Sequence, residues 1–153
     1  MQGNKKIKLI VDATCVKHGR WLRLLGFDTE IIKGAIGVDK IKEGILITRN
    51  KKLKRKFKSD VLLLPDMPFW DALNFIIRML SLEESLRPFT RCSLCNEEVI
   101  NIPKEKVKGK VPYYVYETQD NFYICQKCNK IYWRGSHYEK FLEDIRKKIK
   151  IDI

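Results

Sequence analysis

The sequence predicts an α/β domain with a parallel sheet, followed by a smaller cysteine-rich module and a terminal helix. Three short and almost wholly apolar runs, Ile7–Val11, Ile45–Thr48 and Val61–Leu64, are typical of strands covered on both faces. Segments with helical periodicity separate these runs, which favours right-handed crossovers between parallel strands. After Pro88 the pattern changes to paired cysteines, aromatic residues and short strands.

The connecting elements of the first part are predicted in order. Val16–Leu25 is a helix, and Asp28–Ile32 is a weaker strand candidate. Arg49–Lys58 is a basic helix or turn in which Leu53 and Phe57 lie four residues apart and can contact the core together. A heavily apolar helix follows over residues 69–81. Its single polar side is formed by Asp71, Asn74, Arg78 and Ser81.

The cysteine-rich part predicts strands over Val111–Glu117, Asn121–Ile124 and Ile131–Trp133. A terminal helix then begins at the capping-box pattern Ser136-x-x-Glu139. Its apolar positions are Tyr138, Phe141, Leu142, Ile145 and Ile149, and its other face carries Lys140, Lys147 and Lys148. Such a helix needs a surface to pack on. The shift in composition divides the chain into an α/β domain over residues 1–88, a ribbon over residues 89–138 and a helix over residues 139–153.

Composition and charge narrow the class of protein. The 153 residues include 31 Lys and Arg but 19 Asp and Glu, a net charge of +12 that favours a polyanionic partner. No apolar run approaches the roughly 20 residues that cross a membrane. The start of the chain is polar and basic, and the apolar run that follows is too short for a signal-peptide core. We therefore expect a soluble, cytoplasmic protein.

The cysteines predict a structural metal site. Cys92/Cys95 and Cys125/Cys128 are two Cys-x-x-Cys pairs separated by 29 residues. Two such knuckles supply four thiolates to one tetrahedral zinc ion, the layout of a zinc ribbon. A redox pair, unrelated buried thiols and an iron site are the alternatives. Cys15 is expected to be a small core residue, and His137 a hydrogen-bonding or surface histidine.

Polar residues follow the predicted strands where ligands gather in parallel sheets. Asp12 comes after the first strand, Asn50 after the third and Asp66 after the fourth, although Asp66 also suits an N-cap for the helix after Pro68. Further acidic candidates are Asp28, Glu30 and Asp39. Several carboxylates in one pocket would hold the magnesium or manganese ion of a nuclease.

Longer motifs resemble one family. They are Asp12-Ala13, Lys17, Arg20-Trp21-Leu22-Arg23-Leu24-Leu25-Gly26-Phe27-Asp28-Thr29, Ile47-Thr48-Arg49-Asn50, Arg91-Cys92-x-x-Cys95-Asn96, Cys125-x-x-Cys128 and Ile131-Tyr132-Trp133-x-Gly135-Ser136-His137-Tyr138. Together they resemble the Mut-seven C-terminal RNase family, over about residues 6–138. The resemblance implies a small PIN-like sheet domain followed by a zinc ribbon, metal-dependent RNase activity, and Asp12 as a metal ligand.

The sequence departs from the family pattern at two places. Asn50 stands where the family motif usually has Asp, and an amide is a much weaker magnesium ligand than a carboxylate. The segment between the second and third strands is also short, with Asp39 and Glu43 as its acidic residues. The candidate catalytic residues are therefore Asp12 and Asp39, with Asn50 replacing the expected acid. Magnesium or manganese is needed if the site is active.

A basic surface is predicted beside this site. Lys51–Lys58 holds six basic residues in eight. The candidate RNA-binding residues are Lys17, Arg20, Arg23, Arg49, Lys51, Lys52, Lys54 and Arg55. Lys104, Lys106, Lys108 and Lys110 would share one face of an extended segment, and Tyr113, Tyr114 and Trp133 are exposed aromatic candidates. An acidic membrane surface is the alternative to RNA.

Three functional hypotheses follow. The first is an RNA-binding protein with weakened chemistry that docks on structured RNA or on a ribonucleoprotein such as the ribosome. The second is an active metal-dependent endoribonuclease. A third hypothesis is a toxin-like or maturation nuclease whose site is completed by a partner.

Overall fold

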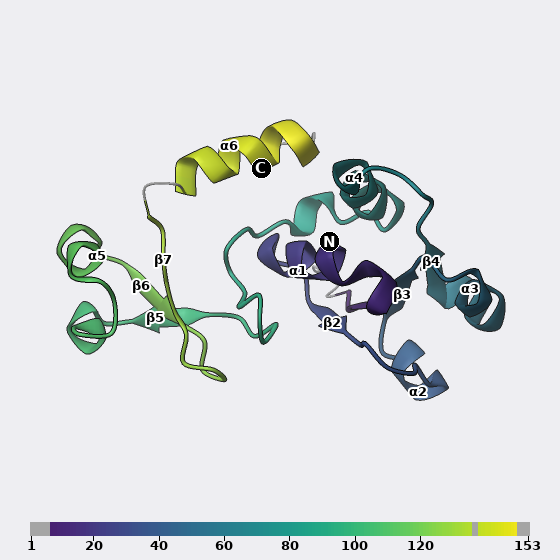
Figure 1. Cartoon of the computed structure of the whole chain (residues 1–153), viewed down its shortest axis with the longest axis horizontal. Helices are drawn as coiled ribbons and strands as arrows, with labels where there is room; N and C mark the ends of the chain where they lie inside the picture. Colours follow the sequence, from purple (N-terminus) through teal and green to yellow (C-terminus); the bar gives the residue numbers. More distant parts are fainter. Residues whose placement is uncertain (1–6, 136–137, 150–153) are drawn as a thin grey trace, which may run out of the picture.

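The computed structural model describes residues 7–135 and 138–149. Figure 1 shows an α/β domain at one end of the molecule, a small antiparallel ribbon at the other, and the last helix running between them. The predictions for Ser136 as a capping residue and for His137 lie outside the described residues.

The α/β domain is built on four parallel strands in the order β2-β1-β3-β4. Their bounds are β1 (Leu9–Val11), β2 (Thr29–Ile31), β3 (Ile45–Thr48) and β4 (Val61–Leu63). Leu9 pairs with Thr29 on one side and with Ile45 on the other, so β1 is central. The direction of strand succession reverses between β1 and β3, which places a topological switch point at their carboxyl ends.

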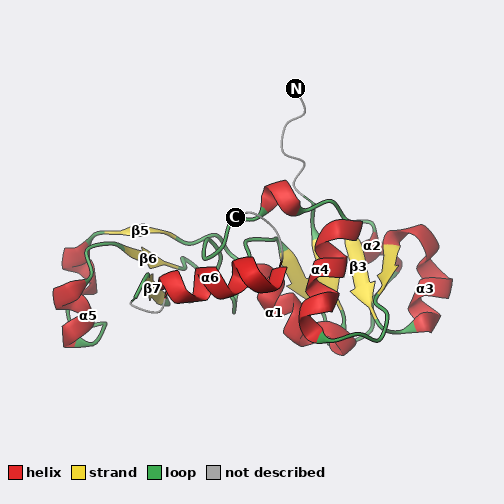
Figure 2. Ribbon diagram, turned by 90° about the horizontal axis from the view of Figure 1, so that it is seen from above, coloured by secondary structure: helices red, strands yellow, loops and turns green. Residues whose placement is uncertain are grey.

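Helices cover both faces of this sheet, as the apolar runs predicted (Figure 2). On one face lie α1 (Val16–Leu24) and α4 (Phe69–Met79), and on the other lie α2 (Val38–Ile41) and α3 (Lys51–Phe57). Successive strand residues alternate between the two cores: Leu9 and Val11 belong to the first, Ile10 to the second. Leu53 and Phe57 pack into the second core as predicted. Short 3-10 turns occupy Ala13–Cys15, Lys58–Asp60, Glu83–Ser85 and Lys104–Val107.

The ribbon is a three-stranded antiparallel sheet in the order β5-β6-β7. Its strands are β5 (Ile100–Ile102), β6 (Phe122–Ile124) and β7 (Ile131–Trp133). The sequence predicted β6 and β7 but missed β5. The predicted strand over Val111–Glu117 is wrong, because Tyr113–Thr118 forms helix α5. Pro112, whose fixed φ suits the start of a helix, precedes α5, and Val115 turns into the small ribbon core.

The segment before α5 also differs from its prediction. Lys104–Val107 is a 3-10 turn and not an extended stretch, so its lysines do not alternate along one face. Val107, the last residue of this turn, is fully buried in the ribbon core and so anchors the turn there. Lys104 lies over the ring of Tyr116 and pairs with Asp120 at 3.5 Å.

Helix α6 (Tyr138–Ile149) returns to the α/β domain and completes its core. Ile145 and Ile149 are buried in the same cluster as α1 and α4, and the rings of Trp21 and Phe141 stack at 5.3 Å. Asn74, which the sequence placed on the polar side of its helix, is instead buried and donates a 2.7 Å hydrogen bond to the carbonyl of Lys148. The predicted apolar face of the terminal helix is confirmed.

Asp66 is exposed, and Pro68 is the N-cap residue of α4 without a side-chain cap bond, so the predicted Asp66 cap is wrong. Cys15 is buried in the core as predicted. Within the described residues, no helix has the length and apolar character needed to span a membrane.

Candidate functional site

Asp12 lies at the carboxyl end of β1, beside the switch point, and is 6% exposed. Its Oδ1 accepts hydrogen bonds from the backbone N–H of Thr14 at 3.0 Å and from the Thr14 hydroxyl at 2.5 Å. Its Oδ2 accepts a 2.5 Å hydrogen bond from the hydroxyl of Thr48 at the end of β3. The two threonines therefore fix the orientation of the carboxylate and join the ends of the central strands.

Asn50 directly precedes helix α3 and serves as its N-cap. Its Oδ1 accepts a 2.9 Å hydrogen bond from the backbone N–H of Lys52, a role that Asn fills well. The backbone N–H of Asn50 donates to Thr48 Oγ1, and that of Arg49 donates to Thr14 Oγ1, both at 3.0 Å. The cap explains why α3 starts at Lys51 and not at Arg49. The amide oxygen of Asn50 is therefore already hydrogen-bonded to the first turn of α3.

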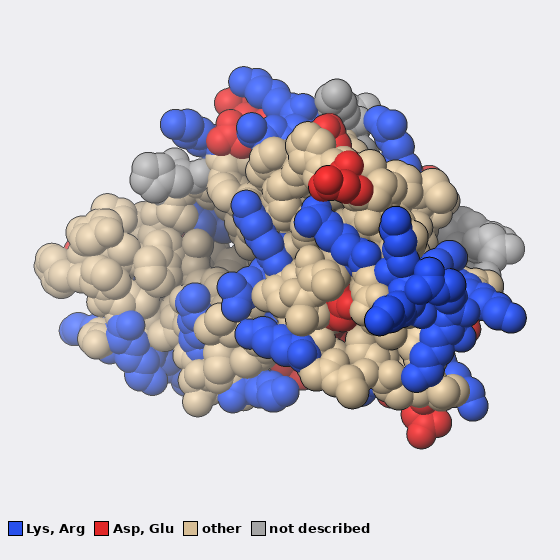
Figure 3. Space-filling view, turned by 45° about the vertical axis from the view of Figure 1, so that its right-hand side comes forward, with Lys and Arg blue, Asp and Glu red and all other residues tan. Residues whose placement is uncertain are grey.

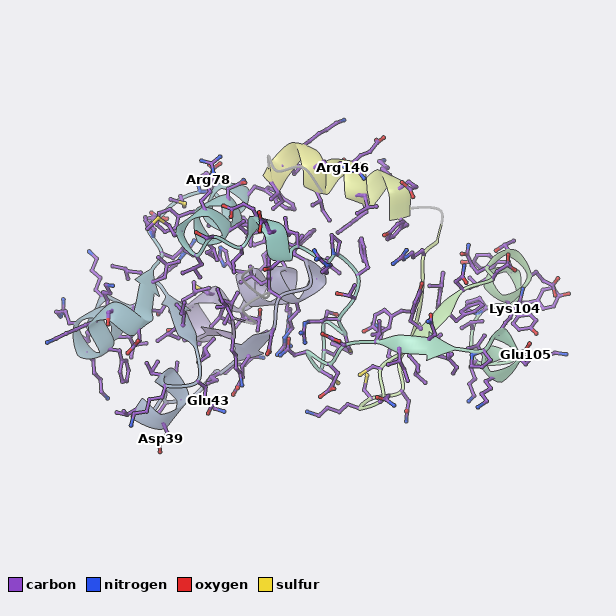
Figure 4. All side chains as sticks on the ribbon, turned by 180° about the vertical axis from the view of Figure 1, so that it is seen from behind. Asp39, Glu43, Arg78, Lys104, Glu105 and Arg146 are labelled. Carbon is purple, nitrogen blue, oxygen red and sulfur yellow. The ribbon has the colours of Figure 1, made fainter. Side chains whose placement is uncertain are left out.

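The other predicted acids do not join Asp12. Asp39 is exposed in the first turn of α2, and Figure 4 shows it pointing away from the sheet. Glu30 and Glu43 form ion pairs of 3.0–3.5 Å with Lys8 and Lys40. Within the described ranges, the four cysteines of the ribbon are the one group of three or more Cys, His, Asp or Glu side chains close enough to hold an ion. Among the described residues, the edge around Asp12 therefore holds no group of three or more acidic side chains close enough to share one ion.

His18 is a buried residue of the α/β domain that the sequence did not single out. It is 6% exposed, and neither ring nitrogen has a hydrogen-bond partner among the described residues. Its ring lies 4.9 Å from that of Phe69. Burial lowers the pKa of His18 to about 4, with smaller contributions from the positive charges of Arg49 and Lys17. The imidazole is therefore neutral at physiological pH. No periodicity in the sequence distinguishes such a histidine from an exposed one.

Basic residues gather over α3, on the side of the molecule that faces forward in Figure 3. Lys51, Lys52 and Arg55 are exposed there, next to Asn50. Lys54 is half-buried, and its ammonium donates to the carbonyls of Lys58 and Val61 at 2.9 and 2.7 Å. Lys54 thus stabilises the end of α3, and its contact with RNA stays a prediction. We name the four exposed cations Arg49, Lys51, Lys52 and Arg55 the α3 rim.

Arg20 and Lys17 are exposed on α1, whereas Arg23 is partly buried. The Arg23 guanidinium donates to the carbonyls of Thr29 at 2.7 Å, Ser93 at 3.0 Å and Leu94 at 3.4 Å. Burial lowers its pKa, although the group stays charged. Because Ser93 and Leu94 lie inside the first cysteine pair, Arg23 ties the ribbon to the α/β domain.

The four cysteines converge from two knuckles of the same design. Asn96 and Asn129 follow the pairs with φ values of +66° and +63°, a left-handed conformation that Asn tolerates. Each donates its backbone N–H to the carbonyl of the first cysteine in its pair at 2.8 Å. The four sulfur atoms lie within 4.8 Å of one another, and Cys92 Sγ lies 3.8 Å from Cys128 Sγ.

This geometry fits a tetrahedral ion. Four sulfurs at about 2.3 Å from a zinc centre would lie about 3.8 Å apart. Burial acts to raise the pKa of Cys92, but hydrogen bonds from the Tyr132 hydroxyl, at 2.9 Å, and from the backbone N–H groups of Cys95 and Leu94 lower it to about 7. These donors favour the thiolate, which is the form that binds a metal. The cluster could therefore hold a metal ion.

Fold and site together define an α/β protein with a four-strand parallel sheet and an appended four-cysteine ribbon. The family model of the Mut7-C RNAse domain matches residues 7–145, which is nearly the whole chain. The chain belongs to that family, as its motifs suggested. No curated protein and no solved structure matches it.

Proposed function

We propose that this chain is an RNA-binding member of its family whose nuclease centre is weakened. The observation that carries the proposal is that Asn50, and not an acid, follows β3 at the edge where Thr14 and Thr48 hold Asp12, and that the Asn50 Oδ1 caps α3. Beside that edge, the α3 rim supplies four exposed cations. The site therefore favours attraction of phosphate over tight binding of a catalytic cation.

The chemistry of magnesium supports the weakened centre. Mg²⁺ dehydrates reluctantly and is usually held by one or two carboxylates together with substrate phosphates. In this chain Asp12 is the acid at the switch point, and the oxygen of Asn50 is engaged with the N–H of Lys52. This edge of the sheet thus lacks one full negative charge that the family pattern supplies. We expect weak metal occupancy at ordinary magnesium concentrations and little or no RNA cleavage.

The charge distribution supports RNA as the partner. The α3 rim and the net charge of +12 offer phosphate contacts that release counterions and do not depend on base sequence. We propose structured RNA as the ligand, either free or within a ribonucleoprotein such as the ribosome. We also propose that the ion of the ribbon is zinc with a structural role, because four thiolates with no open position suit zinc.

A cleavage assay on three chains tests this proposal. The native chain, Asp12→Asn and Asn50→Asp are each incubated with labelled RNA in manganese and in a chelator. We expect no chelator-sensitive cleavage by the native chain and tighter manganese binding by Asn50→Asp, because a second carboxylate joins Asp12. Asp and Ser both cap helices, so Asn50→Ser is the control that changes the residue without adding charge.

An active metal-dependent endoribonuclease is the second candidate. Membership of an RNase family favours it, together with the fixed orientation of Asp12 by Thr14 and Thr48. Robust chelator-sensitive cleavage by the native chain that Asp12→Asn abolishes would establish this candidate and refute the weakened centre.

A further inference from the structure

A cleft of about 780 Å³ lies between the ribbon and the aromatic residues that join it to the α/β domain. Its walls come from α5 and the β6-β7 sheet on one side, and from Phe89 and helix α6 on the other. The volume falls within the range of about 300–1,000 Å³ that is usual for small-molecule sites. The cleft is far in the sequence from Asp12 and shares no lining residue with the switch point.

The lining is aromatic on both sides. Seven of its 15 residues are Phe, Tyr or Trp. On the side of α6, Phe89 packs against Tyr138 and Phe141, with ring centroids 4.9 and 5.2 Å apart, so this wall is fixed. On the ribbon side, Tyr114 of α5 is 70% exposed and lies outside the apolar cluster of the ribbon. Its ring is therefore available to a ligand.

The charge of the cleft is positive. Two arginines and no Asp or Glu occur among the described residues that line it. Arg91 is engaged, because it donates to the carbonyls of Gly26 and Asn96 and forms a 3.3 Å ion pair with Glu98. Arg134 is exposed and lies over the rings of Tyr123 and Tyr138, at 5.6 and 5.0 Å, without an acidic partner among the described residues. Its guanidinium can therefore reach a phosphate while it stays stacked.

The lining also carries neutral hydrogen-bonding groups beside the rings. Ser93, Thr118 and Gln119 contribute such side chains to the cleft. A flat aromatic ligand with polar edges and an attached phosphate matches this combination of rings, amide, hydroxyls and free guanidinium. Unpaired bases of RNA are recognised in this way, by stacking on aromatic or arginine planes and by hydrogen bonds to their edges.

We propose that the cleft between the ribbon and α6 binds an unpaired nucleobase of single-stranded RNA, with Tyr114 stacking on the base and Arg134 contacting the adjacent phosphate. This inference rests on the RNA binding proposed above and adds a second contact to it. The α3 rim then supplies affinity for the backbone, and the cleft selects strands with accessible bases. A proline-rich peptide would also stack on aromatic rings, but it would not use the positive charge.

Neighbouring tyrosines of α5 provide a matched test. Tyr113 and Tyr114 are 78% and 70% exposed, yet Tyr113 is not among the residues that line the cleft. Binding is measured by fluorescence anisotropy with a short labelled single-stranded RNA and with the same strand carrying abasic sites. We expect Tyr114→Ala to weaken binding of the intact strand about tenfold and to change binding of the abasic strand little, since stacking of this kind is lost with the ring.

The remaining variants separate stacking from folding and from charge. Tyr114→Phe should retain binding because the ring remains, while Tyr114→Leu should lose it although bulk remains. Arg134→Gln should weaken both strands, and Tyr113→Ala should weaken neither. Unchanged metal content in each variant shows that the ribbon is folded.

Equal binding by Tyr114→Ala and Tyr113→Ala, or an equal loss on both strands, would overturn the nucleobase site while RNA binding itself stands. A native chain that binds neither strand nor a structured RNA would refute the proposed function, and with it this site. These two failures are distinguishable because the abasic strand retains the phosphates that the α3 rim would contact.

Discussion

Asn96 Nδ2 donates a 2.7 Å hydrogen bond to Asp28 Oδ1, which joins the first cysteine knuckle to the α/β domain. On the other side of the same amide, Asn96 Oδ1 accepts a 2.9 Å hydrogen bond from the backbone N–H of Thr29. Arg23 reaches the same knuckle from α1. This contact is therefore built from one stretch of sequence, residues 23–29, and from Asn96, whose backbone is left-handed.

Replacing Asp28 by Ala should loosen this junction. The hydrogen bond to a charged acceptor is lost, and Asn96 keeps an unpaired amide, so we expect unfolding to become easier by about 1–3 kcal/mol. Denaturant unfolding monitored by tryptophan fluorescence measures the change. Glu97→Ala is the control, because Glu97 is an exposed acid of the same knuckle. Equal stability of the two variants would show that the Asp28–Asn96 contact contributes nothing.

The ribbon should contain one zinc ion per chain. Replacing any of Cys92, Cys95, Cys125 and Cys128 by Ser should abolish metal binding and unfold the ribbon, because three thiolates leave the tetrahedral site open. Elemental analysis of freshly purified protein gives the metal and its amount. Cys15→Ala is the matched control: Cys15 is a buried thiol away from the cluster, and this variant should keep its metal. Native protein without zinc would contradict the prediction.

The α3 rim should act through phosphate contacts. Neutralising Lys51, Lys52 and Arg55 to Ala should weaken binding of all RNA sequences and reduce the slope of log K against log salt by about one unit per lost contact. The measurement is a salt titration of RNA affinity. Lys106, Lys108 and Lys110 are exposed on the ribbon, so their joint neutralisation is a control that removes the same charge elsewhere. If both triple variants lose the same affinity and slope, net charge and not the rim attracts RNA.

The buried imidazole of His18 should make stability depend on pH. Its pKa is about 4 in the folded chain, below the ordinary value of 6.5, so the unfolded chain binds more protons between these values. The stabilising contribution is therefore complete above pH 6.5 and is lost as pH falls toward 4. The loss is up to about 3 kcal/mol.

Denaturant unfolding of the native chain and of His18→Leu across this window checks the sign. Leu has no proton to bind, and the ring nitrogens of His18 have no partners among the described residues. The variant should therefore lose part of the acid sensitivity, while it keeps its packing against Phe69. Identical pH profiles for the two chains would assign the acid sensitivity to other groups, among them the carboxylates.

The sequence predicted the parallel sheet because its strands are short, apolar and covered on both faces. Ile10, for example, is fully buried although it faces a different core from Leu9. The four-cysteine cluster was predictable because two-residue spacing restricts both sulfurs of a pair to one ion. Helix α5 was missed because its tyrosines and Val115 favour strands when considered alone. In the folded chain, Pro112 at the start of the segment and the burial of Val115 favour the helix over a strand.

The site was partly predictable for a similar reason. Residues that follow parallel strands share one edge, and this placed Asp12 and Asn50 together. Arg23 and Lys54 donate hydrogen bonds to carbonyls that are distant in the sequence or fixed only by folding. The sequence shows only the positive charge of these residues, and for that reason they were predicted to contact RNA. The sequence did not show that Asp39 lies in the first turn of α2, where it is exposed while Ile41 of the same helix packs in the core.

Helix α6 has a consequence for the order of events during synthesis. Domains generally begin to fold from their N-terminal parts as the chain emerges, yet Ile145 and Ile149 complete the core that α1 and α4 begin. The cysteines of the ribbon leave the ribosome before these two residues do. If the knuckles bind a metal ion, they can therefore do so while the apolar surface that α6 covers on the sheet domain is still exposed. A chain whose synthesis stops before α6 would have a metal-bound ribbon next to a sheet domain with exposed apolar residues. Such a chain would be expected to bind chaperones.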